Sequence, residues 1–451
     1  MELEEMNMTE QVVALLEEKK YRQLRDLLAE QNPADLAPLM EGLEPTARAV
    51  AFRLLSKDRA AETFVELESD TQTLLIRSFS DAELKEIVDE LYVDDAVDLI
   101  EEMPANVVRR ILDQTDPETR RAINEILKYP DDTAGSLMTV EYVGLRTGMT
   151  VADAFANIRR TGIDKETIYN CYVVDDDRKL LGMVTAKSLM LAEQDEVIDD
   201  LTEQDIITVR TLEDKEEVAR KFAKYDLLAI PVVDSEDRLV GIVTVDDAID
   251  VIQEEATEDM EKMAAITPTD KSYLSTGVFE TWWKRIPWLL LLMVSATITS
   301  TILGKFNERL AIVPILTIFI PMLMDTAGNA GGQSSVTVIR ALSLGDVKMG
   351  DVFRVVWKEL RVAFLCGICL AAVGFGKVIL IDGASPVQAL VVSLTMALTI
   401  LVAKFVGCTL PILAKRIGLD PAVMAAPFIT TIVDALSLLV YCNVAALLLH
   451  I

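Results

Sequence analysis

One carboxylate stands in the middle of an apolar stretch near the end of the chain. Asp434 lies in PFITTIVDALSLLVY, and Thr430 and Thr431 precede it by about one helical turn. A lone carboxylate inside a bilayer costs roughly 2.5–3.5 kcal/mol on insertion scales, so it is normally paired or part of an ion pathway. The stretch contains no basic residue. In a symmetric dimer two Asp434 side chains could form an acidic ring selective for cations. A protonated Asp434 bonded to another helix is the structural alternative.

A second apolar stretch, PMLMDTAGNAGGQSSVTVIRAL, carries polar side chains and glycines at residues 321–342. Such a stretch is tolerated at membrane depth only inside protein or beside water. Its amide and hydroxyl side chains recur at a spacing of four, which places them on one face of a helix. The candidate pore-lining residues are Asn329, Gln333, Thr337, Thr430 and Thr431.

Three clusters of acidic residues could bind divalent cations. Two carboxylates about 4 Å apart repel each other by roughly 4 kcal/mol at an effective dielectric constant near 20, so clusters that face one another across domains need cations. Oxygen-only sites suit Mg²⁺ and Ca²⁺. A solvated acidic surface that favours solubility is the alternative. The clusters are Asp94, Asp95 and Asp98 (YVDDAVD), Asp246, Asp247 and Asp250 (TVDDAID), and Glu254, Glu255, Glu258 and Asp259 (EEATED).

Residues 136–255 contain an internal repeat with an offset of 59 residues. The copies read YVVD followed by LGMVT (172–185) and PVVD followed by VGIVT (231–244). Each copy is predicted to be a β-hairpin followed by a helix and preceded by another helix. The pattern resembles the cystathionine-β-synthase (CBS) domain, which usually occurs in pairs and senses small ligands.

The CBS resemblance implies a nucleotide site, because CBS pairs often bind adenine nucleotides through the Thr and Asp of a T-x-x-D motif. The second copy has Thr244 and Asp247, whereas the first has Thr185 and Ser188. The resemblance therefore implies ATP or a related nucleotide at Thr244 and Asp247. A purely structural pair, in which Asp247 is a helix N-terminal acid, is the alternative.

The sequence predicts a multidomain fold that must position these residues. It consists of an N-terminal all-α superhelix, an α/β tandem CBS pair, a connecting helix and a five-helix α transmembrane domain. The first part is rich in Leu, Ala and Glu with short breaks such as NPAD and LEPT, which indicates stacked short helices. The expected boundaries are 1–130, 131–255, 256–280 and 281–451.

Five apolar segments are long enough to span a bilayer, and they begin near Pro287, Leu310, Val362, Val387 and Val423. With the N-terminus in the cytoplasm, nine basic residues flank the inner ends of the spans and three flank the outer ends, which fits the positive-inside rule. The acidic N-terminus has no apolar run, so no signal peptide is expected. We expect a multi-pass protein of the plasma membrane with its C-terminus outside.

The charge and the histidine content exclude several functions. The chain has 72 acidic and 43 basic residues, a net charge of −29, and only 8 of the acids follow Arg285. This acidic soluble part repels phosphate backbones, so nucleic acid is not an expected partner. The single histidine is His450, so neither an HExxH zinc site nor a histidine-based triad can form. We do not expect an enzyme.

The order of superhelix, CBS pair, connecting helix and five spans resembles the MgtE family of magnesium channels, as do GNAGGQSS and PFITTIVD. The resemblance implies a homodimer in a lipid bilayer, with a Mg²⁺ pore between the subunits that the second and fifth spans line. Intracellular Mg²⁺ would close it by bridging acids of the soluble domains and the connecting helix. The pore carboxylate maps onto Asp434, the polar second-span residues onto Asn329 and Gln333, and an acid at the cytoplasmic mouth onto Asp420. The sensor acids map onto Asp94, Asp95, Asp98, Asp226, Asp246, Asp247, Asp250, Glu254, Glu255, Glu258 and Asp259.

Two other functions stay open at this point. One is transport of another divalent cation such as Mn²⁺ or Co²⁺, because all-oxygen sites disfavour only the softer zinc. The other is a CBS-regulated membrane sensor without transport. Within the family pattern, Asp325 stands where other members can carry glycine, and Gly332 and Ala426 stand where some carry asparagine.

Overall fold

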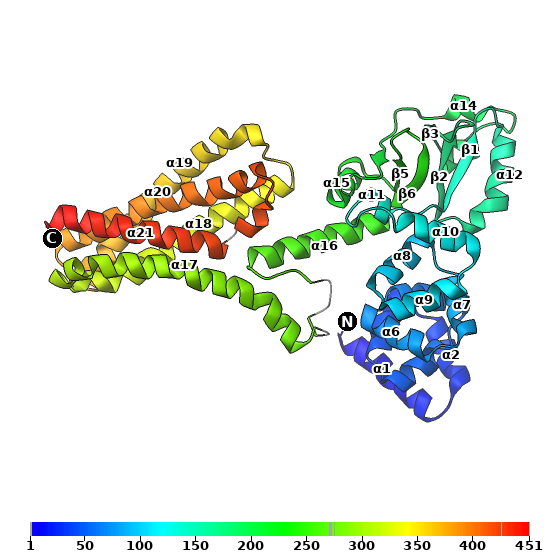
Figure 1. Cartoon of the computed structure of the whole chain (residues 1–451), viewed down its shortest axis with the longest axis horizontal. Coiled ribbons are helices and arrows are strands. Elements are labelled where there is room, and N and C mark those ends of the chain that lie inside the picture. The colour runs from blue at the N-terminus through cyan, green and yellow to red at the C-terminus, as the bar shows by residue number, and fades with distance from the viewer. Residues whose placement is uncertain (1, 270–272, 275, 425, 451) are drawn as a thin grey trace. The chain divides into compact units, whose positions relative to one another are not determined.

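The structure is a computed structural model that describes residues 2–269, 273–274, 276–424 and 426–450. It divides into two compact units, Met1–Gln253 (unit 1) and Glu254–Ile451 (unit 2). Along the chain, Figure 1 shows short helices, then two small sheets, then a bundle of long helices. The expected order of domain types is therefore confirmed.

Unit 1 begins with stacked short helices. Pro33, Pro45 and Pro117 start three of them, and the side chains of Asn32 and Asp116 accept hydrogen bonds from the first-turn N–H groups of two of these. Helices two apart in sequence pack together, namely α3 with α5, α5 with α7 and α7 with α9, which gives a superhelix. Within residues 2–126 the helices are α1 Glu2–Glu17, α2 Tyr21–Ala29, α3 Pro33–Glu41, α4 Pro45–Phe52, α5 Lys57–Val65, α6 Ser69–Ser78, α7 Asp81–Val88, α8 Val93–Glu102, α9 Ala105–Gln114 and α10 Pro117–Ile126.

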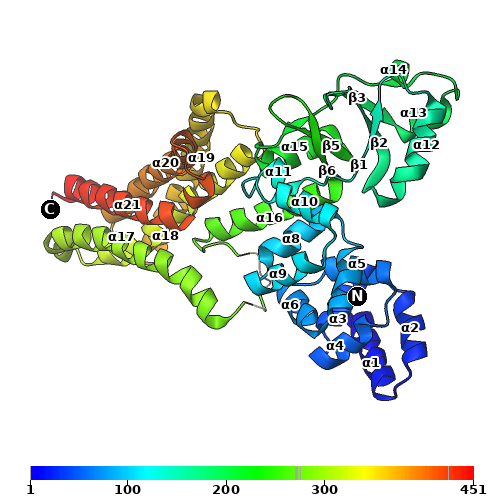
Figure 2. The same cartoon turned by 45° about the vertical axis from the view of Figure 1, so that its right-hand side comes forward.

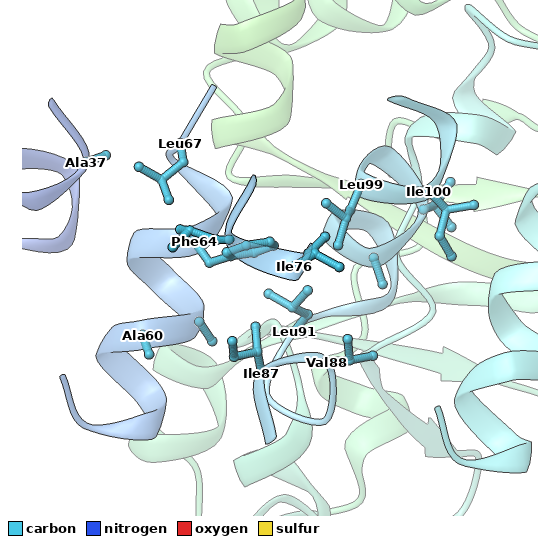
Figure 3. Packing of buried hydrophobic residues seen from close by; sticks show 14 of the residues in the cluster. Ala37, Ala60, Phe64, Leu67, Ile76, Ile87, Val88, Leu91, Leu99 and Ile100 are labelled. Carbon is cyan, nitrogen blue, oxygen red and sulfur yellow. The ribbon is translucent and has the colours of Figure 1, made fainter. Parts of the chain in front are cut away.

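Apolar side chains from successive helices form the core of this superhelix. Phe64, Ile76 and Leu91 are buried and lie close together in Figure 3. Burying apolar surface contributes about 25 cal/mol per Å², so this row of contacts holds the short helices in register. The same core continues into the second sheet of unit 1 through Ile230 and Val243.

The rest of unit 1 is two copies of one α/β motif. In each sheet the middle strand pairs in parallel with the strand before it and antiparallel with the strand after it, giving the orders β1-β2-β3 and β4-β5-β6. Figure 2 shows the part of unit 1 that contains both sheets. The predicted hairpins and helices are present, and the sequence interpretation missed the first strand of each copy and the short helices α11, η1 and α14. The elements are α11 Ala134–Leu137, β1 Tyr142–Arg146, α12 Val151–Thr161, η1 Gly162–Asp164, β2 Thr167–Val174, β3 Leu180–Thr185, α13 Ala186–Leu191, α14 Ile198–Leu201, β4 Val209–Arg210, α15 Lys215–Tyr225, β5 Ala229–Val233, β6 Leu239–Thr244 and α16 Val245–Met263.

The glycine of each repeat has a steric reason. A Cβ atom on Gly182 would clash with the carbonyl oxygen of Glu203, and one on Gly241 would clash with the carbonyl oxygen of Thr139. In both copies a neighbouring backbone segment crosses the hairpin at this point and bridges to it. The repeated G-[apolar]-V-T pattern therefore records a close backbone approach.

Unit 2 contains five long helices among its described residues. Four segments are long and apolar enough to cross a membrane, namely Val278–Glu308, Met349–Leu380, Pro386–Arg416 and Pro421–Leu449. The fifth long helix, α18, carries the predicted polar stretch. Helix α18 packs against α20 and α21, and α20 also packs against α19. The elements are α17 Val278–Ile312, α18 Ile315–Ser343, η2 Met349–Asp351, α19 Val352–Leu380, α20 Pro386–Arg416, η3 Pro421–Met424 and α21 Ala426–Leu449.

Candidate ion pathway and acidic cluster

A polar groove runs along α18 in unit 2. The predicted four-residue spacing holds, because Asn329, Gln333 and Thr337 lie on one exposed face of an unbroken helix. This face lines an open groove of about 630 Å³. The groove is lined by Gly328, Asn329, Gly332, Gln333, Val336, Thr337 and Thr430. The structure thus brings four of the five candidate pore residues together.

The fifth candidate, Thr431, does not line the groove. It lies beside Thr430 on α21, and its hydroxyl donates to the carbonyl oxygen of Pro427 at 3.1 Å. Adjacent helical residues point about 100° apart, so only one of this pair can face the groove.

Asp434 lies one helical turn beyond Thr430 on α21. Its Oδ1 atom is buried and has no hydrogen-bond partner among the residues that the structure describes. Asp325 of α18 lies within electrostatic range of Asp434. Asp325 precedes Asn329 by four residues and is exposed, so it extends the same face of α18. Sequence reasoning gave Asp325 no role, although the spacing of four already included it.

Asp420 lies in the turn between α20 and α21 and holds two partners. Its Oδ1 accepts the backbone N–H of Ala422 at 2.8 Å, and its Oδ2 lies 2.7 Å from Nζ of Lys262. Lys262, at the end of α16, also pairs with Glu258 at 2.7 Å. Burial opposes the charge of Lys262, but these two hydrogen bonds outweigh it and raise the pKa of its ammonium. A lysine that sequence reasoning missed therefore pairs with one predicted sensor acid, Glu258, and with the predicted mouth acid, Asp420.

Asp259 lies in the same part of α16. Its Oδ2 accepts a hydrogen bond of 3.3 Å from the Ser343 hydroxyl at the end of α18. Burial, and next the negative charge of Asp420, raises the pKa of Asp259 above its usual range. The last turns of α16 thus contact the ends of the long helices through polar groups.

Unit 1 gathers acidic residues from four segments, which we call the acidic cluster. Two predicted pairs meet here, at the N-terminus of α8 and at the N-terminus of α16. Two further acids, Glu141 and Glu166, come from the loop before β1 and the residue before β2, and sequence reasoning missed both. Glu141 Oε2 accepts hydrogen bonds from Val93 N at 3.0 Å and Thr139 Oγ1 at 3.1 Å. The acidic cluster comprises Asp94, Asp95, Glu141, Glu166, Asp246 and Asp247.

Crowding changes the protonation of the acidic cluster. Burial, then repulsion by Asp247 and Asp246, raises the pKa of Asp95 to about 7. Burial, then repulsion by Asp246 and Asp247, raises the pKa of Glu166 to about 8. Burial, followed by repulsion from Asp247, also raises the pKa of the 8% exposed Asp94 well above its usual value. Such carboxylates gain from a nearby cation, because it removes both penalties.

The remaining predicted sensor acids lie around this cluster or beyond it. Asp250 lies one turn after Asp247 on α16 and acts on it electrostatically, and Asp98 lies one turn after Asp94 on α8. Asp226 is exposed and ends α15 in the left-handed conformation. Glu254 and Glu255 continue α16 in unit 2. Within the described ranges, no three histidine, cysteine or acidic side chains converge into a complete metal-ligand set.

The nucleotide motif has the same local geometry in both CBS copies. Thr244 Oγ1 donates to Asp247 Oδ2 at 2.6 Å, and Thr185 Oγ1 lies 2.9 Å from Ser188 Oγ. Burial raises the pKa of Asp247 to about 6, against the effect of its hydrogen bond from Thr244. Asp247 is therefore both a helix N-terminal acid and a member of the acidic cluster.

Three family models match separate parts of the chain. Residues 320–444 match MgtE, described as a divalent cation transporter, residues 31–132 match the MgtE intracellular N domain, and residues 134–195 and 198–254 match CBS domains. The magnesium transporter MgtE of Thermus thermophilus is 40% identical over 439 residues, 96% of this chain and 97% of that protein. The chain belongs to the MgtE family of magnesium transporters. The Bacillus subtilis magnesium transporter MgtE is 32% identical over 444 residues, 97% of each chain.

Solved structures match the soluble part. A crystal structure of the cytosolic domain of the Mg²⁺ channel MgtE in complex with ATP is 39% identical, with a TM-score of 0.52, and covers 54% of this chain and 99% of its own. The soluble part of a magnesium transporter is 30% identical, with a TM-score of 0.52, and covers 56% and 99%. Family membership confirms that the chain is a multi-pass membrane protein with an intracellular N domain, and that it is not an enzyme.

Proposed function

We propose that the chain is a magnesium channel for Mg²⁺ uptake that intracellular Mg²⁺ closes. The observation that carries this is Asp434, whose Oδ1 has no hydrogen-bond partner among the described residues and which lies one turn from the groove. Mg²⁺ sheds water reluctantly, so amide and hydroxyl groups suit a hydrated ion while one carboxylate supplies charge. Asn329, Gln333, Thr337 and Thr430 would contact the hydrated ion.

The pathway is formed in a homodimer. An open groove of about 630 Å³ that presents the amide side chains of Asn329 and Gln333 cannot face hydrocarbon without leaving those amides unsatisfied. A second copy in the bilayer encloses it and brings two Asp434 carboxylates toward one axis. In this arrangement the N-terminus is cytoplasmic and the C-terminus is outside, as the flanking basic residues favour.

Closure by intracellular Mg²⁺ uses the acids of unit 1 and of α16. The acidic cluster holds buried carboxylates that repel one another, so cations stabilise the arrangement in which they are close. Asp420 takes part because it already binds a cationic group from α16, the Lys262 ammonium. The proposed sensor residues are Asp94, Asp95, Asp98, Asp226, Asp246, Asp247, Asp250, Glu254, Glu255, Glu258 and Asp259, and Asp420 is the proposed acid at the cytoplasmic mouth.

ATP is a proposed ligand of the CBS pair. The support is the related cytosolic domain that was solved in complex with ATP. Thr244 and Asp247 would face the nucleotide, and because Asp247 also belongs to the acidic cluster, bound ATP would be coupled to Mg²⁺ sensing. Equilibrium binding of ATP to the Thr244→Val variant tests this, with Thr185→Val in the first copy as the matched control. An equal loss of ATP affinity in both variants would contradict the assignment of the nucleotide site to Thr244 and Asp247.

Single-channel recording of the purified full-length protein tests the function. With Mg²⁺ as the only permeant cation we expect unitary currents, and raising Mg²⁺ on the cytoplasmic side should lower the open probability without changing their size. Absence of Mg²⁺ current would refute transport and would favour the CBS-regulated sensor. An open probability independent of cytoplasmic Mg²⁺ would refute the gating.

Transport of Mn²⁺ or Co²⁺ is the second candidate. The groove offers oxygen and amide groups, which do not discriminate strongly among hard divalent ions. Competition measurements in the same recordings separate the candidates. Mn²⁺ or Co²⁺ currents larger than the Mg²⁺ current at equal concentration would favour the alternative.

A further inference from the structure

A charged pair lies inside unit 2 on the buried side of α18, and the ion pathway described above does not use it. Lys404 of α20 is 5% exposed, Glu359 of α19 is 9% exposed, and Ser334 of α18 is 1% exposed. Lys404 Nζ donates to Ser334 Oγ at 3.1 Å and lies 3.6 Å from Glu359 Oε2. Ser334 Oγ in turn donates to Glu359 Oε2 at 2.6 Å. These three side chains, the triad, join three membrane helices.

Compared with apolar packing, the triad is an energetically unfavourable way to hold helices together. Charged side chains within a bilayer are unfavourable, and apolar residues of similar volume often pack as stably as a buried ion pair. Stability alone therefore does not account for a lysine and a glutamate at this depth. A charged pair with directional hydrogen bonds fixes geometry more tightly than apolar packing does.

The geometry that it fixes is that of the groove. Ser334 follows Gln333 directly, so the triad holds one side of α18 while Gln333 faces the groove on another. Helices α18 and α20 also touch backbone to backbone, because a Cβ atom on Gly407 would clash with the carbonyl oxygen of Gly331. The glycines set the separation of the two helices, and the triad sets the rotation of α18. A rotation by one residue, about 100°, would replace Gln333 by Ser334.

We propose that Lys404, Glu359 and Ser334 are positioning residues for the ion pathway. They hold α18 in the rotation that presents Asn329, Gln333 and Thr337 to the groove, and Glu359 balances the charge of Lys404 so that no uncompensated positive charge lies behind a cation path. This inference rests on the proposed function, because it assumes that ions pass along the groove.

Recordings on four variants of the full-length channel test the proposal. Lys404→Met and Glu359→Gln should each lower the unitary Mg²⁺ current at least fivefold in channels that fold. Lys404→Arg keeps the charge and the donors and should stay within about twofold of the unmodified chain. The neutral double variant Lys404→Met with Glu359→Gln should recover part of the current lost in Glu359→Gln, because it leaves no unpaired cation. Where a single variant fails to fold, the arginine and double variants still decide.

A second lysine pair provides the matched control. Lys377 and Asp382, at the end of α19, form an ion pair of 2.8 Å, and Lys377→Met should leave the unitary current unchanged. Currents unaltered in both single variants, or equal losses in Lys377→Met and Lys404→Met, would overturn the proposal. So would an arginine variant as impaired as the methionine variant. Absence of Mg²⁺ current in the unmodified chain refutes the proposed function instead, so the two failures are distinguishable.

Discussion

The groove of unit 2 and the acidic cluster of unit 1 differ in the charge of their polar side chains, because the groove is mainly neutral and the cluster consists of carboxylates. The groove has amides and hydroxyls with Asp434 one turn away, whereas the acidic cluster has six carboxylates. A carboxylate in the bilayer costs several kcal/mol, and near water it costs much less. Conduction also requires weak binding, so that an ion can leave, while a sensor must hold its ion. The difference in charge therefore matches the difference in the proposed tasks.

The largest effect should come from the membrane carboxylate. We expect Asp434→Asn to lower Mg²⁺ flux at least 100-fold, about 2.7 kcal/mol in barrier terms, because the charge near the groove is lost. Asn443→Ala on the same helix is the control, since Asn443 is exposed and its amide donates to the carbonyl oxygen of Leu439 on its own helix. Isotope or fluorescent-indicator flux into vesicles, normalised to folded protein, measures both. An unchanged Mg²⁺ flux in a folded Asp434→Asn variant would contradict the proposed role of the carboxylate near the groove.

The second-largest effect should be a pH dependence of the stability of the acidic cluster. The pKa values of Asp95, Glu166 and Asp247 are raised to about 7, 8 and 6, whereas in the unfolded chain such groups titrate near 4. Protonation therefore stabilises the folded cluster at low pH, and this stability is lost as pH rises from about 4 to 8. Without Mg²⁺, amide protection of α8 and the start of α16 in the full-length protein should fall at least tenfold between pH 5 and pH 8. Hydrogen exchange measures this, and Mg²⁺ should restore protection more at pH 8 than at pH 5. Protection that rises with pH would contradict the raised pKa values.

Removing sensor charge should change gating and leave conduction intact. For the double variant Asp95→Asn with Asp247→Asn we expect about a tenfold rise in the cytoplasmic Mg²⁺ concentration that halves the open probability, roughly 1.4 kcal/mol of lost binding. The exposed Asp176→Asn in the CBS part is the control. Open-probability titrations measure the shift. A reduced unitary current in the double variant would contradict the assignment of gating to the acidic cluster and of conduction to the groove.

The smallest effect should come from a neutral groove residue. Gln333→Ala removes a dipole that would contact the hydrated ion through water on the proposed pathway, so we expect a fall in unitary current of about threefold. Val336→Ala, also on the groove, is the control because it removes no polar group. A loss as large as that of Asp434→Asn would show that amides, and not the carboxylate, dominate the pathway.

Much of the fold and part of the site followed from the sequence. The 59-residue repeat predicted the paired hairpins, and the spacing of four predicted the shared face of Asn329, Gln333 and Thr337. Periodicity reports local geometry, so it could not place Thr431, which turns away from the groove by one helical position. Glu141 and Glu166 were missed because each lies in a short loop before a strand, outside any run of acids at helical spacing.

The sequence by itself determined the domain order, the membrane segments and the acidic character of the soluble part, because these depend on composition and on short-range spacing. Only the tertiary structure decided which charges meet. In the tertiary structure Glu141 and Glu166 lie near Asp94 and Asp95. Lys262 forms an ion pair with Asp420, and Lys404 forms an ion pair with Glu359. Electrostatic energy depends on distances between residues far apart in the chain, and those distances are set by packing, which no local pattern records.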